Sequence, residues 1–434
     1  MAAPISSVPL PAAAQTAPGT ETPNYTPALA SLTVLFFMMG FVTVLNDILI
    51  PYLKGLFTLS YTEVGMVNFC FFGAYLLIGV PAGILVRKVG YKNGMLVGFL
   101  VAALGAFLFF PAAEGRTFPL FLGALFILAS GIVTLQVAGN PYVAILGPPE
   151  SASARLTLTQ AFNSLATAFG PYVGTKLILS RLPDPKTMTP AQAAVLDVTP
   201  VQNLYLVVGG IMLLISIILF FVKLPRIAQE SAPVGDTSRA WHHRHLLLGL
   251  LGIFTYVGAE VAIGSHIVSY LNQTEVMNLT AEIAGYWVMA YWGGAAIGRF
   301  LGTIIMRSIR PSLLLSFNAV GAIALLLISV SSTGELAMYS LLAVGLMNSI
   351  MFPVIFTLAV TGLGRHTEDA SGLLSASIVG GAIIPLFFGL IADSTLGGGG
   401  VQALRWAFVL PVLCYAYIAW YGMKGYRPAA ITGV

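Results

Sequence analysis

The sequence predicts an all-α integral membrane protein in which twelve transmembrane helices form two pseudo-symmetric six-helix halves. Three observations predict this class. Hydrophobic residues make up 57% of the 434 residues and charged residues only 8%, whereas soluble domains carry about a quarter charged residues. Twelve apolar stretches reach the ~20 residues that a helix needs to cross a bilayer. The longest polar stretch after the N-terminal tail, 224–245, leaves six of them on either side.

The twelve apolar stretches account for most of the chain. In order they cover residues 28–53, 64–86, 94–113, 118–146, 156–180, 201–223, 246–271, 282–306, 312–331, 336–362, 371–392 and 401–424. We therefore predict an N-terminal half at 28–223, a cytoplasmic linker at 224–245, a C-terminal half at 246–424 and a cytoplasmic tail at 425–434. Residues 1–27 lack a basic region joined to an apolar core, so we expect a disordered cytoplasmic tail and no cleaved signal.

The two halves resemble each other in sequence. PAGILVRKVG at 81–90 is similar to FLGTIIMRSI at 300–309, and LTQAFNSLATAFGP at 158–171 matches LLSASIVGGAIIP at 373–385 less closely. Both matches fall in corresponding segments of the halves. Parallel repeats of this kind are typical of transporters that bind their substrate near the middle of the membrane.

The distribution of Lys and Arg predicts the orientation. The loops that follow even-numbered segments, together with the C-terminus, hold about twice as many basic residues as the other loops, and Arg87, Lys88 and Arg307 are examples. The positive-inside rule then puts both termini in the cytoplasm. Arg299 is left out of this comparison because we expect it inside the segment 282–306.

Asp47 is a carboxylate within an apolar run, in FVTVLNDILIPYLKG at 41–55. It lies roughly 10 Å inside the end of its segment at 1.5 Å per residue, where a charge costs at least ~2.5 kcal/mol. Pro51 leaves the carbonyl of Asp47 without its helical donor, which is tolerated where backbone lines a cavity. We predict that Asp47 binds the coupling proton or cation, with a structural hydrogen bond to a neighbouring helix as the alternative. Asn46 beside it is a secondary candidate.

Glu260, in YVGAEVAIGSHIVSYL, is a second carboxylate inside an apolar segment. The same reasoning makes it a candidate for ion coupling. His266 follows six residues later and is the counterpart of Asp47 at the offset of the first repeat match. A lone His near a helix end is more often structural, so His266 is a secondary candidate.

Uncharged amides inside apolar segments are candidates for substrate binding. Gln136 and Asn140 are four residues apart, and Gln160 and Asn163 are three apart, so each pair shares one helix face. Asn348 lies in GLMNSIMFP. Amides donate and accept hydrogen bonds at once, which suits a neutral polyhydroxylated ligand. The alternative for each amide is a hydrogen bond between helices.

Aromatic side chains add to this set. Trp292 could stack on a sugar ring, and Tyr291 precedes it in the same segment. Asn68, in the second segment, is a further secondary candidate.

Composition and spacing exclude other classes of protein. Basic residues do not cluster as they do in a nucleic-acid interface. Cys70 and Cys414 lie in apolar stretches, outside any CxxC or Cys/His spacing, so we expect no disulfide or metal. WHHRH at 241–245 has no carboxylate or Cys to complete a zinc site. Lone carboxylates do not form a catalytic cluster, so we expect neither an enzyme nor a cofactor.

With these residues identified, the chain resembles the fucose–proton symporter family of the major facilitator superfamily, and within it the bacterial glucose/galactose branch. The resemblance extends from Ser31 to Tyr421. It is carried by LNDILIPYLK, FCFFGAYL, PAGILVRKVGYK, LQVAGNPYVAILG, RLTLTQAFNSL, YVGAEVAIGS, NSIMFPVIF and IVGGAIIP.

The resemblance implies roles for individual residues. Asp47 matches the coupling aspartate of the fucose members and Asn163 an asparagine that lines their sugar cavity. Gln136 stands where those members have an acidic residue, and Glu260 where they have an amide. The departure at Gln136 fits the glucose/galactose branch, and Glu260 could compensate for the missing acid. Arg87 replaces the Asp of the superfamily loop motif, so the usual gating ion pair is not implied.

The resemblance also implies a function. We expect a secondary transporter in the cell inner membrane that imports a hexose, glucose or galactose, by proton symport and works as a monomer in the lipid bilayer. Sodium coupling, or transport of fucose or mannose, are alternatives. Efflux of amphipathic compounds is disfavoured by the amides, and a membrane sugar sensor would usually carry an appended soluble domain.

Overall fold

The computed structural model describes residues 25–57, 61–177, 197–225, 239–394 and 400–428. Within these ranges some side chains are not described, among them those of Asn46, Asp47 and Asn68. Most of the tail predicted at 1–27, most of the linker predicted at 224–245 and the end of the C-terminal tail therefore fall outside the described residues. Of the predicted tail, Thr26 and Pro27 belong to the first turn of a helix.

The described residues are helical except for short connections. The helices are α1 (Thr26–Phe57), α2 (Tyr61–Val89), α3 (Tyr91–Glu114), α4 (Phe118–Ile145), α5 (Ala152–Leu177), α7 (Thr199–Phe221), α8 (Arg244–Leu271), α9 (Ala281–Ile305), α10 (Pro311–Ser331), α11 (Gly334–Asn348), α12 (Met351–Val360), α13 (Thr367–Ala376), α14 (Gly380–Ala392), α15 (Gly400–Ala407) and α16 (Val409–Trp420). Single 3-10 turns are η1 (Pro149–Ser151), η3 (Ala240–His242), η4 (Gly364–His366) and η5 (Ser377–Val379), and a π turn, η7 (Tyr421–Gly425), follows α16.

Each of the twelve predicted segments corresponds to a helix or to a pair of consecutive helices. Within the described residues, ten helical spans are long and apolar enough to cross a membrane. Several begin where the local chemistry favours a helix start. Proline occupies the first turn of α4, α7 and α10. Backbone N–H groups in the first turn have no acceptor within the helix, so the lack of an N–H in proline costs nothing there. Thr280 caps α9, since its Oγ1 accepts from the N–H of Ile283 at 3.4 Å.

Three of the segments predicted as continuous helices are interrupted. Segment 336–362 divides into α11 and α12, 371–392 into α13, η5 and α14, and 401–424 into α15 and α16. Proline explains two of the breaks, because it cannot donate to the carbonyl four residues earlier. Pro353 leaves the carbonyl of Ser349 free, and Pro411 that of Ala407, and each break lies at the freed carbonyl.

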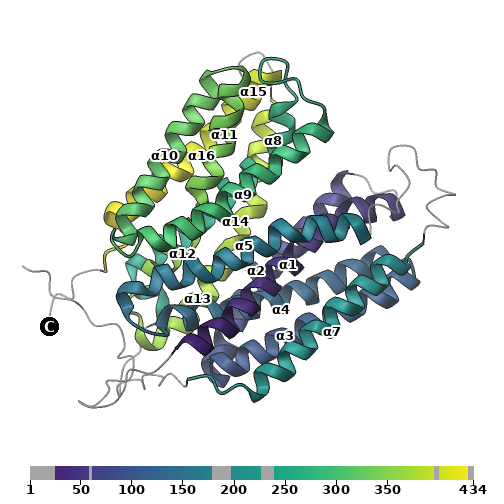
Figure 1. The fold of residues 1–434 in the computed structure, drawn as a ribbon, viewed down its shortest axis with the longest axis vertical. Coiled ribbons are helices and arrows are strands. Elements are labelled where there is room, and N and C mark those ends of the chain that lie inside the picture. The colour runs from purple at the N-terminus through teal and green to yellow at the C-terminus, as the bar shows by residue number, and fades with distance from the viewer. Residues whose placement is uncertain (1–24, 58–60, 178–196, 226–238, 395–399, 429–434) are drawn as a thin grey trace, which may run out of the picture.

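Figure 1 shows the helices in two groups. The purple-to-teal helices α1–α5 and α7 lie together, and the C-terminal helices α8–α16 form a second group. Within the first, α3 packs on α4 and α7, and α1 on α5. Within the second, α8 packs on α12, α14 and α16, and α10 on α11 and α16. The groups meet where α2 packs on α13 and where α5 packs on α9 and α12.

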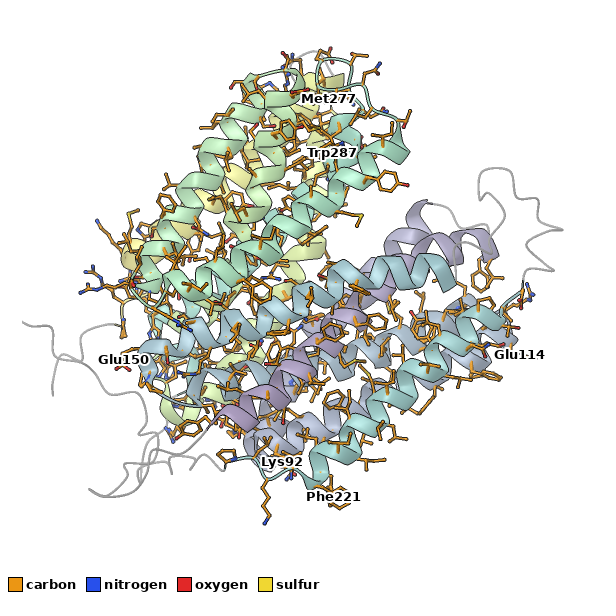
Figure 2. All side chains as sticks on the ribbon, in the orientation of Figure 1. Lys92, Glu114, Glu150, Phe221, Met277 and Trp287 are labelled. Carbon is orange, nitrogen blue, oxygen red and sulfur yellow. The ribbon has the colours of Figure 1, made fainter. Side chains whose placement is uncertain are left out.

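Several charged side chains lie at the ends of this bundle. Lys92, Glu114 and Glu150 are at helix ends in Figure 2, while apolar side chains cover the lengths of the helices. Lys92 Nζ donates to the carbonyl of Phe220 in the last turn of α7 at 2.8 Å, a favourable place for a cation. The apolar surface between the charged ends matches the hydrocarbon layer of a membrane.

Candidate functional site

Three of the predicted amides link α4 to its neighbouring helices, two of them to α5 and one to α2. Gln160 Nε2 donates to Asn140 Oδ1 at 3.4 Å, which joins the two helices. Gln136, one turn before Asn140, donates from Nε2 to the hydroxyl of Tyr75 on α2 at 3.0 Å. Tyr75 is buried and was not predicted from the sequence, because an apolar run containing Tyr reads as core packing.

Asn140 is the least satisfied of these amides. Its side chain is fully buried, and its Nδ2 has no hydrogen-bond partner within the described residues. A buried donor without an acceptor costs about 1–3 kcal/mol. An acceptor that enters this region from outside the protein would relieve that cost.

Asn163 also makes a contact between helices. Its Nδ2 donates to the carbonyl of Phe36 on α1 at 3.0 Å. The two helices approach closely here, since a Cβ at Gly40 would lie 2.2 Å from the carbonyl oxygen of Asn163. Glycine at position 40 therefore allows α1 and α5 to pack closely, and the hydrogen bond of Asn163 stabilises this packing.

In the C-terminal half, Glu260 is part of a buried hydrogen-bond network. The hydroxyl of Tyr256, one turn earlier on α8, donates to Glu260 Oε1 at 2.6 Å. The hydroxyl of Tyr291 on α9 donates to the backbone carbonyl of Glu260 at 3.2 Å. Asn348 continues the network, because its Nδ2 donates to the Tyr291 hydroxyl and its Oδ1 accepts from the Tyr415 hydroxyl, each at 2.7 Å.

This network joins α8, α9, α11 and α16 through side chains that are at most 9% exposed. Tyr256 and Tyr415 were not predicted. Tyr256 could have been predicted, because it lies four residues before Glu260 on the same helix face. No feature of the sequence around Tyr415 indicates its role.

Trp292 differs from its neighbours in being 37% exposed. Its ring lies edge-on to that of Tyr291, with centroids 5.2 Å apart and an interplanar angle of 78°. A Cβ at Gly264 of α8 would lie 3.1 Å from Trp292 Cζ2, so the glycine gives the indole room. An indole with exposed surface can stack on a sugar ring.

His266 lies apart from the amides. Its Nδ1 is 2.8 Å from the carbonyl of Ala262 in its own helix, and its ring packs on Phe388 of α14 at a centroid distance of 4.4 Å. The side chains of Asn46, Asp47 and Asn68 are outside the described residues. The backbone of Asp47 lies in α1, which continues through Pro51 to Phe57.

Arg299 of α9 is a charged residue inside the bundle. Its Nε donates to the carbonyl of Ser349 at 3.0 Å, the carbonyl that Pro353 leaves free. The side chain of Asn318 on α10 donates to the neighbouring carbonyl of Met347 at 2.9 Å. Two side chains thus replace backbone donors at the break between α11 and α12.

The two groups of helices contact each other at one end. Arg87 of α2 forms an ion pair with Asp369 of α13. Ser371 donates to the carbonyl of Val137, at 2.9 Å, which Pro141 leaves without its helical donor. Ser153 of α5 and Thr357 of α12 share a hydrogen bond of 2.6 Å.

Glycines allow α2 and α13 to meet closely at this end. A Cβ at Gly79 would lie 2.6 Å from the carbonyl of Gly372, and a Cβ at Gly83 would lie 2.8 Å from the carbonyl of Glu368. Small residues at such a crossing are typical of helix pairs in membranes.

Histidines gather at the same end without forming a metal centre. The ring of His243 is 5.9 Å from that of His245 and 5.7 Å from that of His366, between centroids. Burial and the nearby His242 lower the pKa of His243, so the neutral imidazole is favoured there. Among the described residues no group of three or more His, Cys, Asp or Glu is arranged to hold a metal ion.

Comparison with known proteins supplies a context for this site. The model of the Major Facilitator Superfamily matches residues 32–385. The chain is 50% identical to a glucose/galactose transporter of Brucella abortus (strain 9-941), over 93% of this chain and 95% of that protein. It is 34% identical to the L-fucose-proton symporter of Escherichia coli (strain K12), over 92% and 93%. A crystal structure of the transporter FucP in the outward conformation matches with a TM-score of 0.83, 34% identity and coverage of 92% of this chain and 99% of that one.

Proposed function

The chain belongs to the major facilitator superfamily, and we propose on that basis that it imports a hexose, glucose or galactose, together with a proton. Its relatives, a glucose/galactose transporter and an L-fucose-proton symporter, support a sugar transporter of the symporter type and not an enzyme. The choice of sugar rests on the name of the Brucella relative, and the choice of ion on the name of the fucose symporter.

The observation that supports sugar binding most directly is the unpartnered Nδ2 of Asn140. A sugar hydroxyl accepts a hydrogen bond as readily as it donates one. Gln160 contacts Asn140, and Gln136 lies one helical turn before it on α4 with a bond to Tyr75. Both can exchange their present partners for hydroxyls. An uncharged, polyhydroxylated ligand fits a region in which the described side chains offer amides.

The proposed sugar site extends to both halves. Asn163 supplies a further amide in the N-terminal half, and Trp292 offers an exposed indole face in the C-terminal half. Asn348 has both ends of its amide engaged by tyrosines, so we assign it an indirect role, in which it holds Tyr291 beside Trp292. A sugar analogue that lacks one hydroxyl would leave an amide unpaired in a dry site, so the site would reject that analogue.

We assign ion coupling to Asp47 and Glu260. Both carboxylates lie in membrane-spanning helices, where ionisable residues mark ion pathways. Gln136 is uncharged and hydrogen-bonded to Tyr75, so the position that is acidic in fucose members contributes no titratable group. Glu260 would then be the second carboxylate of the cycle.

Alternating access requires the halves to separate where they now touch. The contacts of α2 with α13 and of α5 with α12 lie at the end to which the positive-inside rule assigns the cytoplasm. We therefore propose that this conformation is closed to the cytoplasm, in a monomer that resides in the inner membrane with both termini inside the cell.

Counterflow of labelled glucose in proteoliposomes tests the function. We expect galactose to compete with glucose, and fucose and mannose to compete weakly. Uptake under an imposed pH gradient, with and without sodium, then tests the ion. The absence of counterflow with every hexose would refute sugar transport. Uptake that follows only the sodium gradient would show that sodium, and not the proton, is the coupling ion.

A further inference from the structure

Thr157 of α5 carries a buried hydroxyl that no part of the described chain satisfies. Its side chain is fully buried, and its Oγ1 has no hydrogen-bond partner within the described residues. A hydroxyl in a helix usually donates to a carbonyl three or four residues earlier. Thr159 of the same helix does so, since its Oγ1 donates to the carbonyl of Leu156 at 2.9 Å. The hydroxyl of Thr157 makes no such bond and remains available to a partner outside its own helix.

The neighbours of Thr157 show where its face of α5 points. Ser153, Thr157 and Gln160 are separated by four and three residues, so they share one helix face. Ser153 shares a hydrogen bond of 2.6 Å with Thr357 of α12, and Gln160 donates to Asn140 of α4 at 3.4 Å. The helices α4, α5 and α12 contact one another (Figure 1). Thr157 therefore lies between a contact that joins the two halves and an amide of the proposed sugar site.

Asn140 on the neighbouring helix has the same deficiency. Its Nδ2 is a second fully buried polar atom without a partner among the residues that the structure describes. This nitrogen can only donate, whereas the hydroxyl of Thr157 can donate and accept. A single sugar hydroxyl can bond to both, because it accepts from an amide while it donates to a second oxygen.

Close packing alone does not explain the hydroxyl of Thr157. Valine has nearly the same shape as threonine and would leave no buried polar atom unsatisfied at this position, which is favourable for stability. A hydroxyl that weakens the fold where an apolar group of the same shape is available points to a ligand that completes it.

Contacts between the halves enclose this region in the present conformation. Ser153 is in the first turn of α5, and its bond to Thr357 lies one turn closer than Thr157 to the end that we assign to the cytoplasm. Ser371 of α13 donates to the carbonyl of Val137 of α4 at 2.9 Å. Both bonds must break when the halves separate at that end. The two unpartnered atoms then become accessible from the cytoplasm.

We propose that Thr157 is a further sugar-binding residue, which together with Asn140 holds one hydroxyl group of the transported hexose as the cytoplasmic end opens. This assignment rests on the proposed function, because the ligand is the hexose named there. It makes Thr157 a determinant of specificity, since an analogue that lacks this hydroxyl group leaves buried polar atoms unpaired.

Exchange of sugar analogues by Thr157→Val tests the assignment. Each monodeoxy analogue of glucose is placed on both sides of proteoliposome membranes, and its competition with labelled glucose is measured during equilibrium exchange. Exchange carries every sugar through both conformations, so each one meets Thr157. The wild type should disfavour one analogue relative to glucose. In Thr157→Val this discrimination should shrink about fivefold, while the ratios for the other analogues stay unchanged. The melting temperature should not fall.

Two variants serve as controls. Thr157→Ser keeps the hydroxyl and should keep the discrimination. Thr159→Val removes a buried hydroxyl of the same helix that is already bonded to the backbone, and it should leave the affinity for every analogue unchanged.

Wild-type discrimination in Thr157→Val would overturn the assignment. An equal loss of affinity for glucose and for every analogue would also overturn it, because the hydroxyl would then act on the structure or through a bridging water and not on one sugar hydroxyl. Failure of the proposed function is recognised separately, since the wild-type protein would then exchange no hexose at all. Normal exchange by the wild type together with either contrary result refutes the role of Thr157 alone.

Discussion

The amide of Asn163 has a structural partner as well as a proposed ligand. Its Nδ2 bonds to the carbonyl of Phe36, so Asn163→Ala should lower stability by about 1 kcal/mol and sugar affinity at least tenfold. Calorimetric titration with glucose measures the second effect. The matched control is Asn318→Ala, which removes a similar bond to a carbonyl on another helix and should leave affinity unchanged. Wild-type affinity in Asn163→Ala would remove this residue from the sugar site.

A substitution at Gln136 tests whether the amide at this position, which is acidic in the fucose members, affects ion coupling. Gln136→Glu introduces a carboxylate beside the hydroxyl of Tyr75, which can turn and donate to it. We expect the pH dependence of glucose uptake to shift, because a second titratable group enters the N-terminal half. Gln136→Met keeps the size without the charge and serves as the control. An unchanged pH profile in Gln136→Glu would mean that this position does not communicate with the coupling ion.

Asp47 tests the coupling mechanism. Moving an unpaired carboxylate through a closed, dry state is costly, so its charge must be neutralised before the loaded carrier reorients. Asp47→Asn imitates the neutral form and cannot release a proton. It should therefore lose uphill accumulation and keep exchange of external for internal sugar. Both rates are measured on one preparation of proteoliposomes, and full accumulation by Asp47→Asn would transfer the coupling role to Glu260.

At the scale of helices, the sequence was sufficient for the class of fold and insufficient for the breaks. Twelve apolar segments predicted the all-helical membrane fold, which is confirmed, because hydrophobic length is a local property. The break that Pro353 produces between α11 and α12 is capped by Arg299 and Asn318, which lie far away in sequence. Proline alone does not predict a break, since α4 continues through Pro141.

The site residues illustrate the same limit. Gln136 and Asn140, and Gln160 and Asn163, could be placed on shared helix faces from their spacing, but the contact between Gln160 and Asn140 could not. Tyr415 could not be identified either, because its bond to Asn348 joins residues 67 positions apart. A polar residue in an apolar segment is visible in the sequence, but which helix supplies its partner depends on tertiary packing.

The break at Asn348 leads to a prediction for the stability of these helices. Asn348→Leu leaves the hydroxyls of Tyr291 and Tyr415 without the amide that joins them. Each buried unsatisfied group costs about 1–3 kcal/mol, so a lower melting temperature is expected in detergent. Adding Tyr415→Phe removes one of the two stranded hydroxyls, and the double variant should recover part of the loss. Equal stability of Asn348→Leu and the wild type would show that water can replace the amide.

At the scale of the whole molecule, the ion pair between Arg87 and Asp369 joins the two halves. These side chains are 47% and 21% exposed, and an exposed pair contributes at most about 1 kcal/mol. A small energy is sufficient here, because 1.4 kcal/mol changes the ratio of two conformations tenfold. Arg87→Asp and Asp369→Arg each place like charges at the contact and should favour the form open to the cytoplasm.

The double variant Arg87→Asp/Asp369→Arg restores opposite charges with their positions exchanged. It should recover the closed form, measured as protection of a cysteine placed at Ser371, on the buried side of the contact, from a thiol reagent added inside the liposomes. High salt should weaken the difference between the single variants and the wild type, because exposed charges are screened. If the double variant is as accessible to the reagent as the single variants, the contact depends on the shapes of α2 and α13 at Gly79 and Gly83, and its charges are incidental.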